Sequence, residues 1–393
     1  MIWLCLVLAL QAKPKPENAG DPLKVDQAIA RGVLYLREHW DKSQPYRHGP
    51  LTMRTDELVL WTLLHAGIPE TDELFQTLLT RVLESEPGST YRVSLQAMVL
   101  EELDRVQYQP RIWQCAQFLV DNQCRNGQWA YGVKTTYPDF PTKDVATGKS
   151  DPAGRKAAVK HRVPVRAQRQ GPETGDLSNS QYAALGLRAC HDAGIILPQD
   201  LLDRASKSWR DSQNGLRGAK KGKAVSTGQA PVMDPRGWGY NRKFEEDESS
   251  TGSMTAGAVG AIALYDRLLG VEAARDEDLQ AGVSWLVRNS SVQANRKSQE
   301  WHFYYLYALE RAGIFLGTER FGTHEWYPKG AKLLLEQQTE DGGWWSGGWQ
   351  PGQDLYEPGH VWETCFAILF LRRAARPLKD VASFDRFHAP ERK

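Results

Sequence analysis

The chain has 393 residues, of which 41% are hydrophobic and 25% are charged, and its formal net charge is +1. This composition excludes a disordered or collagen-like chain, and the near-neutral charge gives no reason to expect nucleic acid as a partner. The 14 tryptophans indicate wide apolar interfaces or a cavity with flat aromatic walls.

An apolar run begins the chain, from Met1 to Ala12, and is followed by polar residues. It is too short to span a bilayer. It is similar to the hydrophobic part of a secretory signal, although the usual basic segment before it is missing. We therefore expect residues 1–20 to form a signal segment and linker, and the protein to be exported to the periplasm or the cell exterior. Membrane association is left open.

Apolar residues at the spacing of one helix face mark helices that come in six pairs. The expected pairs are 25–40 with 55–67, 72–84 with 91–104, 109–123 with 179–194, 198–213 with 251–270, 275–290 with 298–313, and 326–339 with 360–375. A repeat of this kind outweighs the domain count suggested by length. We predict one all-α domain over residues 21–376, followed by a C-terminal tail at 377–393.

Two long segments, 131–176 and 214–235, interrupt the third and fourth pairs. Both are rich in Lys, Arg, Pro and Gly, a composition typical of loops. Three interpretations stay open: solvated surface loops, a lid over a cavity, or a basic patch for an acidic protein partner.

The cysteines at 115, 124, 190 and 365 lie in apolar helical stretches without the spacing of a zinc site. Buried free thiols are the simplest interpretation. In an exported protein one disulfide, between Cys115 and Cys124, is the alternative.

The first helix of a pair often ends in glutamine followed by Gly-x-Trp, most clearly at Gln337, Gly342 and Trp344, with weaker copies ending at Trp129 and Trp238. This pattern resembles the QW repeat of squalene-hopene and oxidosqualene cyclases, and hence the superfamily of terpenoid cyclases and protein prenyltransferases. The resemblance implies an (α/α)6 toroid, with the first helix of each pair in an outer ring and the second in an inner ring. It also implies that Gln337 and Trp344 are structural residues that join neighbouring repeats.

The catalytic motifs of that superfamily are missing. A class II cyclase protonates an alkene with the acid of Asp-x-Asp-Asp-Thr-Ala, but an alignment on Thr255 and Ala256 puts Thr251, Ser253 and Met254 at the three acidic positions. The Asp-x-Cys pair of the prenyltransferase zinc site is also absent from the sequence. We therefore predict no metal site and no cofactor.

By the same resemblance, the first turns of the inner helices would surround the mouth of the central cavity. The candidate catalytic residues there are the carboxylates Glu300, Glu363 and Asp176. Both glutamates lie beside a tryptophan at the start of an apolar helix, where an unpaired carboxylate is costly to bury. Asp176 is also a good helix N-cap, which is its structural alternative.

Aromatic and polar residues near these carboxylates are expected to line the cavity and bind a ligand. They are Trp301, His302, Tyr304, Gln181, His360 and Trp362. For His302, packing within the helix is the alternative role.

Three functions remain open at this point. The fold and repeats favour a terpenoid-cyclase-like protein that binds or transforms an apolar isoprenoid in its central cavity, although the missing acid motif leaves open whether it is an enzyme. The second hypothesis is a non-catalytic repeat scaffold that contacts a protein partner through its basic loops. The third is an exported carbohydrate-active enzyme, because α/α rings also host glycosidases and lyases, which use paired carboxylates.

Overall fold

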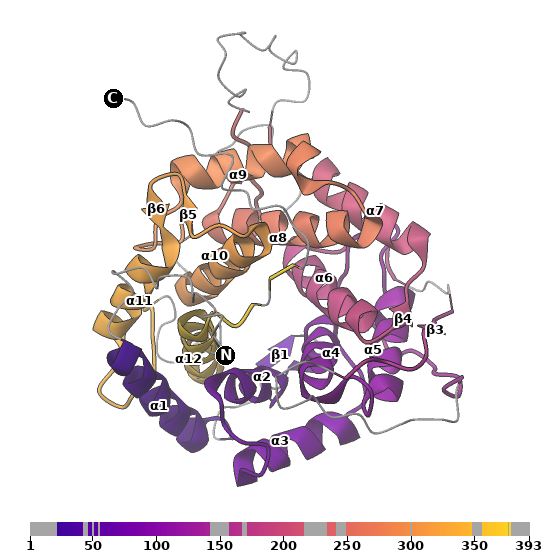
Figure 1. Ribbon diagram of the computed structural model, residues 1–393, viewed down its shortest axis with the longest axis horizontal. Coiled ribbons are helices and arrows are strands. Elements are labelled where there is room, and N and C mark those ends of the chain that lie inside the picture. Colours follow the sequence, from indigo (N-terminus) through magenta and orange to yellow (C-terminus); the bar gives the residue numbers. More distant parts are fainter. Residues whose placement is uncertain are drawn as a thin grey trace, which may run out of the picture.

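The computed structural model describes residues 22–41, 46–48, 51–53, 56–141, 157–166, 171–215, 234–240, 249–298, 301–347, 356–375 and 377–378, with the backbone alone at 46–48, 51–53, 274 and 356–359. Within these ranges the chain forms a closed ring of helical hairpins, an (α/α)6 toroid (Figure 1). The predicted fold class is confirmed, and all six predicted helix pairs are present.

The outer ring contains the first helix of each pair: α1 (Pro22–His39), α3 (Glu73–Glu84), α5 (Gln109–Asp121), α7 (Gln199–Asp211), α9 (Glu277–Asn289) and α11 (Trp326–Gln337). The inner ring contains the second: α2 (Asp56–Ala66), α4 (Thr90–Asp104), α6 (Leu177–Asp192), α8 (Gly252–Leu269), α10 (His302–Leu316) and α12 (Tyr356–Arg372). Each inner helix packs on the next, and α12 packs on α2, which closes the ring.

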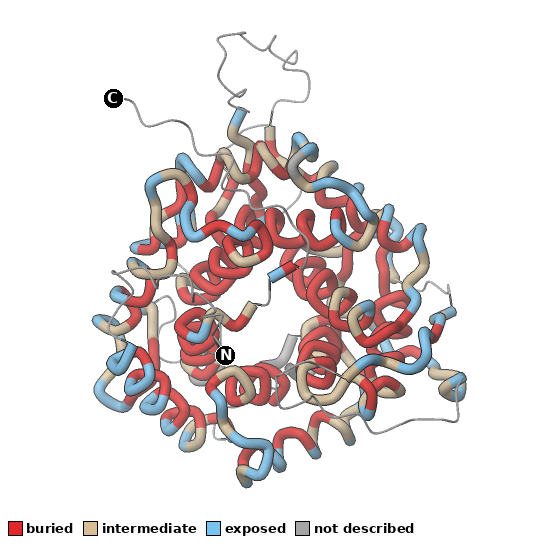
Figure 2. Tube along the Cα trace, viewed as in Figure 1, coloured by how far each residue is buried: buried red, intermediate tan, exposed pale blue. Residues whose placement is uncertain are grey.

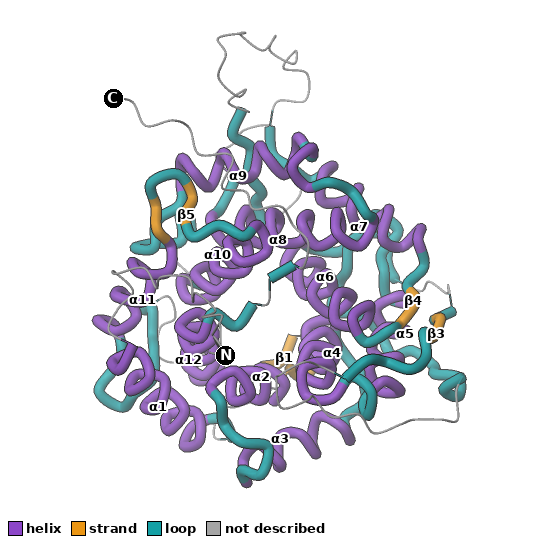
Figure 3. Tube along the Cα trace, viewed as in Figure 1, coloured by secondary structure: helices purple, strands orange, loops and turns teal. Residues whose placement is uncertain are grey.

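Short strands and one 3-10 helix lie in the loops between the helices (Figure 3). Antiparallel pairs are formed by β1 (Tyr46–His48) with β2 (Leu51–Met53) and by β5 (Arg320–Phe321) with β6 (His324–Glu325). A parallel pair joins β3 (Val163–Pro164) to β4 (Ile195–Ile196), and the 3-10 helix η2 (Ala273–Arg275) precedes α9.

The two rings differ in burial because their sequences differ in pattern. Outer helices such as α7 carry one apolar stripe and expose the opposite face, as expected for a helix at a surface. Inner helices such as α8 are buried almost all round (Figure 2). Small residues let the inner helices approach closely: a Cβ added at Gly186 of α6 would lie 2.8 Å from the Cα of Ser94 in α4.

Three tryptophans hold the outer helices to the inner ones by the same pair of hydrogen bonds. Each indole Nε1 donates to a carbonyl in its own outer helix, and each backbone N–H donates to a hydroxyl in the following inner helix. The indole bonds are Trp129 to Leu119 (2.7 Å), Trp238 to Trp209 (2.8 Å) and Trp344 to Leu334 (2.8 Å). The hydroxyl acceptors are those of Ser180, Thr255 and Thr364, at 2.9, 3.0 and 3.0 Å.

Glutamines after three outer helices join one repeat to the next. The side-chain Nε2 of each donates to a backbone carbonyl of the next outer helix: Gln123 to Leu201 (2.9 Å), Gln213 to Asp278 (2.9 Å) and Gln338 to Ala28 (2.8 Å). The last bond connects α11 to α1 and therefore helps to close the ring.

The assignment of this role to Gln337 is wrong by one residue. Gln337 is the last residue of α11 and is exposed, whereas Gln338 follows the helix and pairs with Trp344 in an isolated β-bridge. Gln123 and Trp129 form the same bridge, which puts the glutamine four residues before the glycine of the turn. In all three repeats the glutamine that reaches the next repeat lies just beyond the end of its helix.

Glycines in two outer helices accept a tryptophan from the preceding repeat. A Cβ at Gly32 of α1 would lie 2.6 Å from the Trp344 ring, and one at Gly282 of α9 would lie 2.7 Å from the Trp238 ring. Each of these glycines therefore serves the contact with the preceding hairpin.

Part of the long segment 131–176 packs on α5. The indole of Trp113 donates to Pro164 O at 2.9 Å, and Gln117 Nε2 donates to Arg166 O at 3.1 Å. These contacts lie on the outer ring. Of the segment 214–235, residues 216–233 lie outside the described residues.

The four described cysteines are free and buried, so the alternative of a disulfide between Cys115 and Cys124 is wrong. Burial raises the pKa of Cys115 to about 12 and that of Cys124 to about 11. Among the described helices, none combines the length and apolar character needed to cross a bilayer.

Candidate functional site

The first turns of the inner helices bring Asp176, Ser178 and Tyr91 together at one end of the ring. Tyr91 donates its hydroxyl to Ser178 Oγ at 2.7 Å, and Ser178 donates in turn to Asp176 Oδ1 at 2.7 Å. Tyr240, which is half exposed, lies 3.5 Å from the same serine hydroxyl. The predicted mouth is therefore a polar and aromatic surface.

Asp176 is fully engaged as the N-cap of α6. Its Oδ1 accepts from the backbone N–H of Asn179 at 2.8 Å, and its Oδ2 accepts from Asn179 Nδ2 at 2.7 Å. With Ser178 as a third donor, the carboxylate satisfies free N–H groups at the helix start. These contacts correspond to the structural alternative weighed for this residue.

Glu363 is buried and binds the turn that follows Trp344. Its two carboxylate oxygens accept from the backbone N–H and the hydroxyl of Ser346, at 2.6 and 2.5 Å. Burial raises the pKa of Glu363 to about 7, against the opposing effect of these two hydrogen bonds. Glu363 thus fastens a turn of the outer ring to α12, while Glu300, the third candidate, lies outside the described residues.

The predicted aromatic lining gathers around the start of α10 and α12. Trp301 stacks on Trp362 with ring centroids 5.9 Å apart, and it also contacts Tyr304 edge-on. His360 packs against Trp345, with ring centroids 3.9 Å apart. Flat aromatic pairs of this kind present an apolar face on which a ligand can stack.

His302 points away from this group of aromatic rings. Its Nε2 lies 2.9 Å from Val292 O, and burial lowers its pKa. A neutral, hydrogen-bonded imidazole next to Phe303 matches the packing role that was its alternative.

Gln181 and Tyr304 meet deeper in the ring, as neighbours of Arg311. Gln181 Oε1 accepts from Tyr304 Oη at 2.5 Å and from Arg311 Nη2 at 2.8 Å. Because two donors hold this oxygen, the orientation of the amide is fixed, and its Nε2 has no hydrogen-bond partner. The sequence predicted the first two residues for the lining but missed Arg311.

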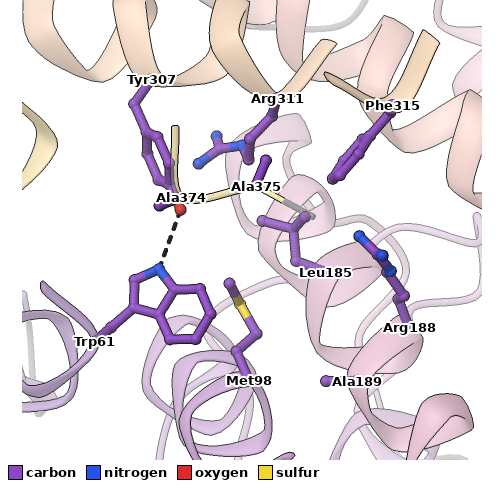
Figure 4. Close-up of a pocket in the computed structure, with 10 residues that line it drawn as sticks. All are labelled: Trp61, Met98, Leu185, Arg188, Ala189, Tyr307, Arg311, Phe315, Ala374 and Ala375. Atoms are coloured by element: carbon purple, nitrogen blue, oxygen red, sulfur yellow. Dashed lines mark hydrogen bonds between the residues drawn. The ribbon is translucent and has the colours of Figure 1, made fainter. Parts of the chain in front are cut away.

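A small pocket, which Arg311 also lines, lies between the inner helices (Figure 4). The residues that line it come from α2, α4, α6, α10 and the chain after α12. They are Trp61, Met98, Leu185, Arg188, Ala189, Tyr307, Arg311, Phe315, Ala374 and Ala375. We call it the central pocket.

The central pocket combines aromatic walls with one buried cation. Trp61 Nε1 donates to the hydroxyl of Tyr307 at 3.1 Å, and the guanidinium of Arg311 lies 4.0 Å from the centre of the Tyr307 ring. Such a cation–π contact partly compensates the charge. Arg311 is only 3% exposed, and the ion pairs found among the described residues do not include it.

The acidic neighbour of Arg311 in the sequence does not provide a free counter-charge. Burial raises the pKa of Glu310 to about 8, so this carboxyl is mostly protonated at neutral pH. Its Oε1 accepts from the backbone N–H of Ala375 at 3.0 Å.

The chain after α12 closes one end of the central pocket. We define the C-terminal segment as Ala374, Ala375, Pro377 and Leu378. It runs across the middle of the ring from α12 toward α6 (yellow in Figure 1), and Arg188 of α6 donates to Pro377 O at 3.2 Å. Ala374 and Leu378 are buried, so this segment belongs to the folded core.

The sequence contained one signal for Arg311 that was not used. Glu310 and Arg311 are adjacent charged residues in the middle of α10, a helix that is otherwise apolar on all sides. Charges in such a helix are buried and need partners or a function.

The described carboxylates at the mouth are engaged in structural contacts rather than paired across a cleft. Glu57 accepts from Arg92 at 2.8 Å and from Gln96 at 3.0 Å, as Asp176 and Glu363 accept from their own partners. In the part of the chain that the structure describes, there is no group of three or more His, Cys, Asp or Glu side chains that could hold a metal ion.

Comparison with solved structures supports the ring fold. The chain is similar to a possible member of the GH105 family from Klebsiella pneumoniae, with a TM-score of 0.50, 11% identity, and coverage of 95% of this chain and 98% of the other. It is less similar to the type II terpene cyclase MstE from Scytonema (TM-score 0.32, 12% identity, coverage 90% and 98%). It also resembles an unsaturated glucuronyl hydrolase from Streptococcus agalactiae (TM-score 0.31, 12% identity, coverage 91% and 92%).

These likenesses concern the fold alone. The TM-score is 0.50 for the possible GH105 member and 0.32 for the terpene cyclase. No protein-family model matches the sequence, and no curated protein matches it.

Proposed function

We propose that this protein binds a small polar organic molecule, of which a saccharide is the best example, in the central pocket of its ring. The observation that carries the proposal is the lining of that pocket, in which the aromatic rings of Trp61 and Tyr307 lie beside the buried guanidinium of Arg311, which itself donates to Gln181 Oε1. Sugars have apolar faces that stack on aromatic rings and hydroxyl groups that need hydrogen-bond partners.

The same lining argues against a purely apolar ligand. Arg311 Nη1 and Gln181 Nε2 are buried without partners. A hydrocarbon chain beside them would leave both donors unsatisfied, at a cost of about 1–3 kcal/mol for each neutral group and more for a charged one. An isoprenoid is therefore a weaker candidate than a ligand that carries oxygen acceptors.

The fold is compatible with a carbohydrate ligand, since the ring is shared with a possible member of the GH105 family. Catalysis is not part of the proposal, because the described carboxylates at the mouth are held in structural hydrogen bonds. An interaction scaffold remains the second candidate, favoured by the many side chains that fill the centre of the ring.

The proposal is tested by saturation-transfer NMR with a panel of neutral and acidic monosaccharides, and with farnesol as the isoprenoid probe. We expect saturation of sugar protons in the wild type and a weaker effect in Trp61→Phe, which removes the indole from the pocket wall. Trp40→Phe, which alters a tryptophan of the outer ring, is the matched control.

Two results would overturn the proposal. Binding of farnesol without any sugar would favour the isoprenoid hypothesis. An equal loss of binding in the Trp61 and Trp40 variants would place the ligand outside the central pocket.

A further inference from the structure

The two unpartnered donors of the ring centre belong to one small hollow beside the central pocket. This side hollow is narrow and is lined by Gln181, Gly257, Arg311 and otherwise apolar residues of α6, α8 and α10. It shares Leu185, Arg311 and Phe315 with the central pocket, so Arg311 lies between the two spaces.

From this geometry we infer that the ligand carries a carboxylate, and that this group is bound in the side hollow by Arg311 Nη1 and Gln181 Nε2. The inference rests on the proposed function, since it names the chemical class of the molecule that the central pocket receives. It describes an organic acid, such as a sugar acid, whose body lies in the central pocket.

The first argument is the state of Arg311. The side chain is 3% exposed, and its Nη2 donates to Gln181 Oε1, while its Nη1 has no hydrogen-bond partner. A planar guanidinium donates to carboxylates through neighbouring N–H groups. A buried cation with a free donor therefore indicates an anion that arrives with the ligand.

The second argument is the orientation of Gln181. Its Oε1 is held by Tyr304 and Arg311, which leaves Nε2 as a fixed donor that no described group accepts from. The absence of a side chain at Gly257 provides the room for this amide, because a Cβ there would lie 1.3 Å from Nε2. Two donors with fixed positions are suited to one anionic group.

The third argument is that the described neighbours of Arg311 supply no competing anion. The hydroxyls of Tyr182, Tyr304 and Tyr307 stay neutral because burial raises the pKa of each. Burial likewise raises the pKa of Glu310 to about 8. The positive charge of Arg311 is therefore available to a ligand at neutral pH.

Two matched probe pairs test the inference by isothermal titration calorimetry at pH 7. D-glucuronate is compared with D-glucuronamide, and benzoate with benzamide, so that within each pair only the carboxylate changes. We expect the acid to bind the wild type at least about tenfold more tightly than the amide in one pair, as a charge-assisted hydrogen bond allows. The pair that shows the effect indicates whether the body of the ligand is a sugar or an aromatic ring.

The variants separate Arg311 from general charge effects. Arg311→Gln should abolish the preference for the acid while the amide still binds. Arg311→Lys should only reduce the preference, because lysine retains the positive charge but lacks the paired N–H donors of the guanidinium. Gly257→Ala, which leaves Arg311 unchanged, should also reduce it by displacing the Gln181 amide. Arg125→Gln removes an exposed charge of the outer surface and should keep the full preference.

The outcomes distinguish the inference from the proposed function. Equal binding of acid and amide by the wild type, or an undiminished preference in the Arg311 variants, would overturn the carboxylate inference and leave the proposed function standing. If neither member of either pair binds, the carboxylate inference is overturned, and the monosaccharide panel alone decides the proposed function.

Discussion

At the scale of single residues, the centre of the ring is unusual because two adjacent ionisable residues, Glu310 and Arg311, are both buried there. Arg311 has aromatic and amide partners, and Glu310 has one backbone N–H from Ala375. The second oxygen of Glu310, Oε2, has no partner in the described structure. A protonated carboxyl fits this environment better than a carboxylate does, because burial without compensating donors disfavours the charged form.

This protonation makes Glu310 a source of pH-dependent stability. Its pKa is about 8 in the folded protein, against an ordinary value of 4.5. Between these values the folded state holds a proton that the unfolded state has released, so stability falls as pH rises, by at most about 1.4 kcal/mol per pH unit. Glu310→Gln keeps an acceptor for Ala375 and removes the titrating group, so its free energy of unfolding should fall less between pH 5 and 8.

Urea denaturation of the wild type and Glu310→Gln at pH 5, 6, 7 and 8 checks this expectation. Glu363 and Asp266 also have pKa values raised by burial, to about 7 and about 6, but they are present in both proteins and cancel in the difference. Parallel stability curves for the two proteins would show that Glu310 does not titrate in this window.

At the scale of helices and repeats, stability depends on contacts that pass from one hairpin to the next. Gln338 donates from the end of α11 to Ala28 O of α1. We expect Gln338→Ala to lower the free energy of unfolding by about 1–2 kcal/mol, because a buried carbonyl loses its donor. Gln337→Ala, at the neighbouring exposed position, is the control and should change stability by no more than about 0.5 kcal/mol. Equal effects of the two substitutions in chemical denaturation would contradict the assignment.

The glycines of the outer helices make a second contact between repeats. Gly282→Ala would put a Cβ 2.7 Å from the Trp238 ring and 2.9 Å from Val259, both of which are buried. Overpacking of this kind costs about 1–3 kcal/mol. We therefore expect a lower melting temperature for Gly282→Ala, even though alanine favours a helix more than glycine does. A variant as stable as the wild type in thermal unfolding would show that Trp238 can shift and that the fit is not tight.

The sequence predicted the elements well because their signal is local. Helix periodicity and the Gln and Gly-x-Trp signals depend on residues close together in the chain, and they placed all six pairs and the joining tryptophans. Arg311 and Trp61 are far apart in the sequence and come together only when the ring closes, so no local pattern revealed the central pocket. Gln337 was preferred to Gln338 because two adjacent glutamines cannot be ranked without knowing where α11 ends.

The candidate carboxylates were chosen because an unpaired carboxylate is costly to bury. This criterion does not identify the hydrogen-bond partners that a carboxylate has in the folded protein. Asp176 binds residues two and three positions ahead, which the N-cap alternative anticipated. Glu363 binds Ser346 across the turn after Trp344, a partner from the preceding outer-ring segment. The sequence therefore predicted the burial of Glu363 correctly, but its hydrogen bonds to Ser346 became visible only in the structure.

At the scale of the whole molecule, the ring is closed twice: between its first and last repeats, and across its centre by the C-terminal segment. Arg372 of α12 pairs with Asp26 of α1 at 2.9 Å. Leu378 and Ala374 are buried against the inner ring, and Ala375 donates to Glu310. The short segment after the last helix is thus part of both the core and the pocket wall.

A pair of truncations tests the role of this segment. Ending the chain after Arg373 removes the buried Leu378 and the wall of the central pocket, and should lower the free energy of unfolding by about 3 kcal/mol. Ending it after Leu378 keeps all the described contacts and serves as the control. Guanidinium denaturation gives both values, and equal stability of the two truncated chains would show that the C-terminal segment does not support the core.

The most direct test of the account is a crystal structure of the protein grown with D-glucuronate. We predict ligand density in the central pocket, with the sugar ring beside Trp61 and Tyr307 and its carboxylate within hydrogen-bond distance of Arg311 Nη1 and Gln181 Nε2. An empty ring centre, with the ligand absent or bound only on the outer surface, would contradict the claim that the centre of this toroid is a binding site.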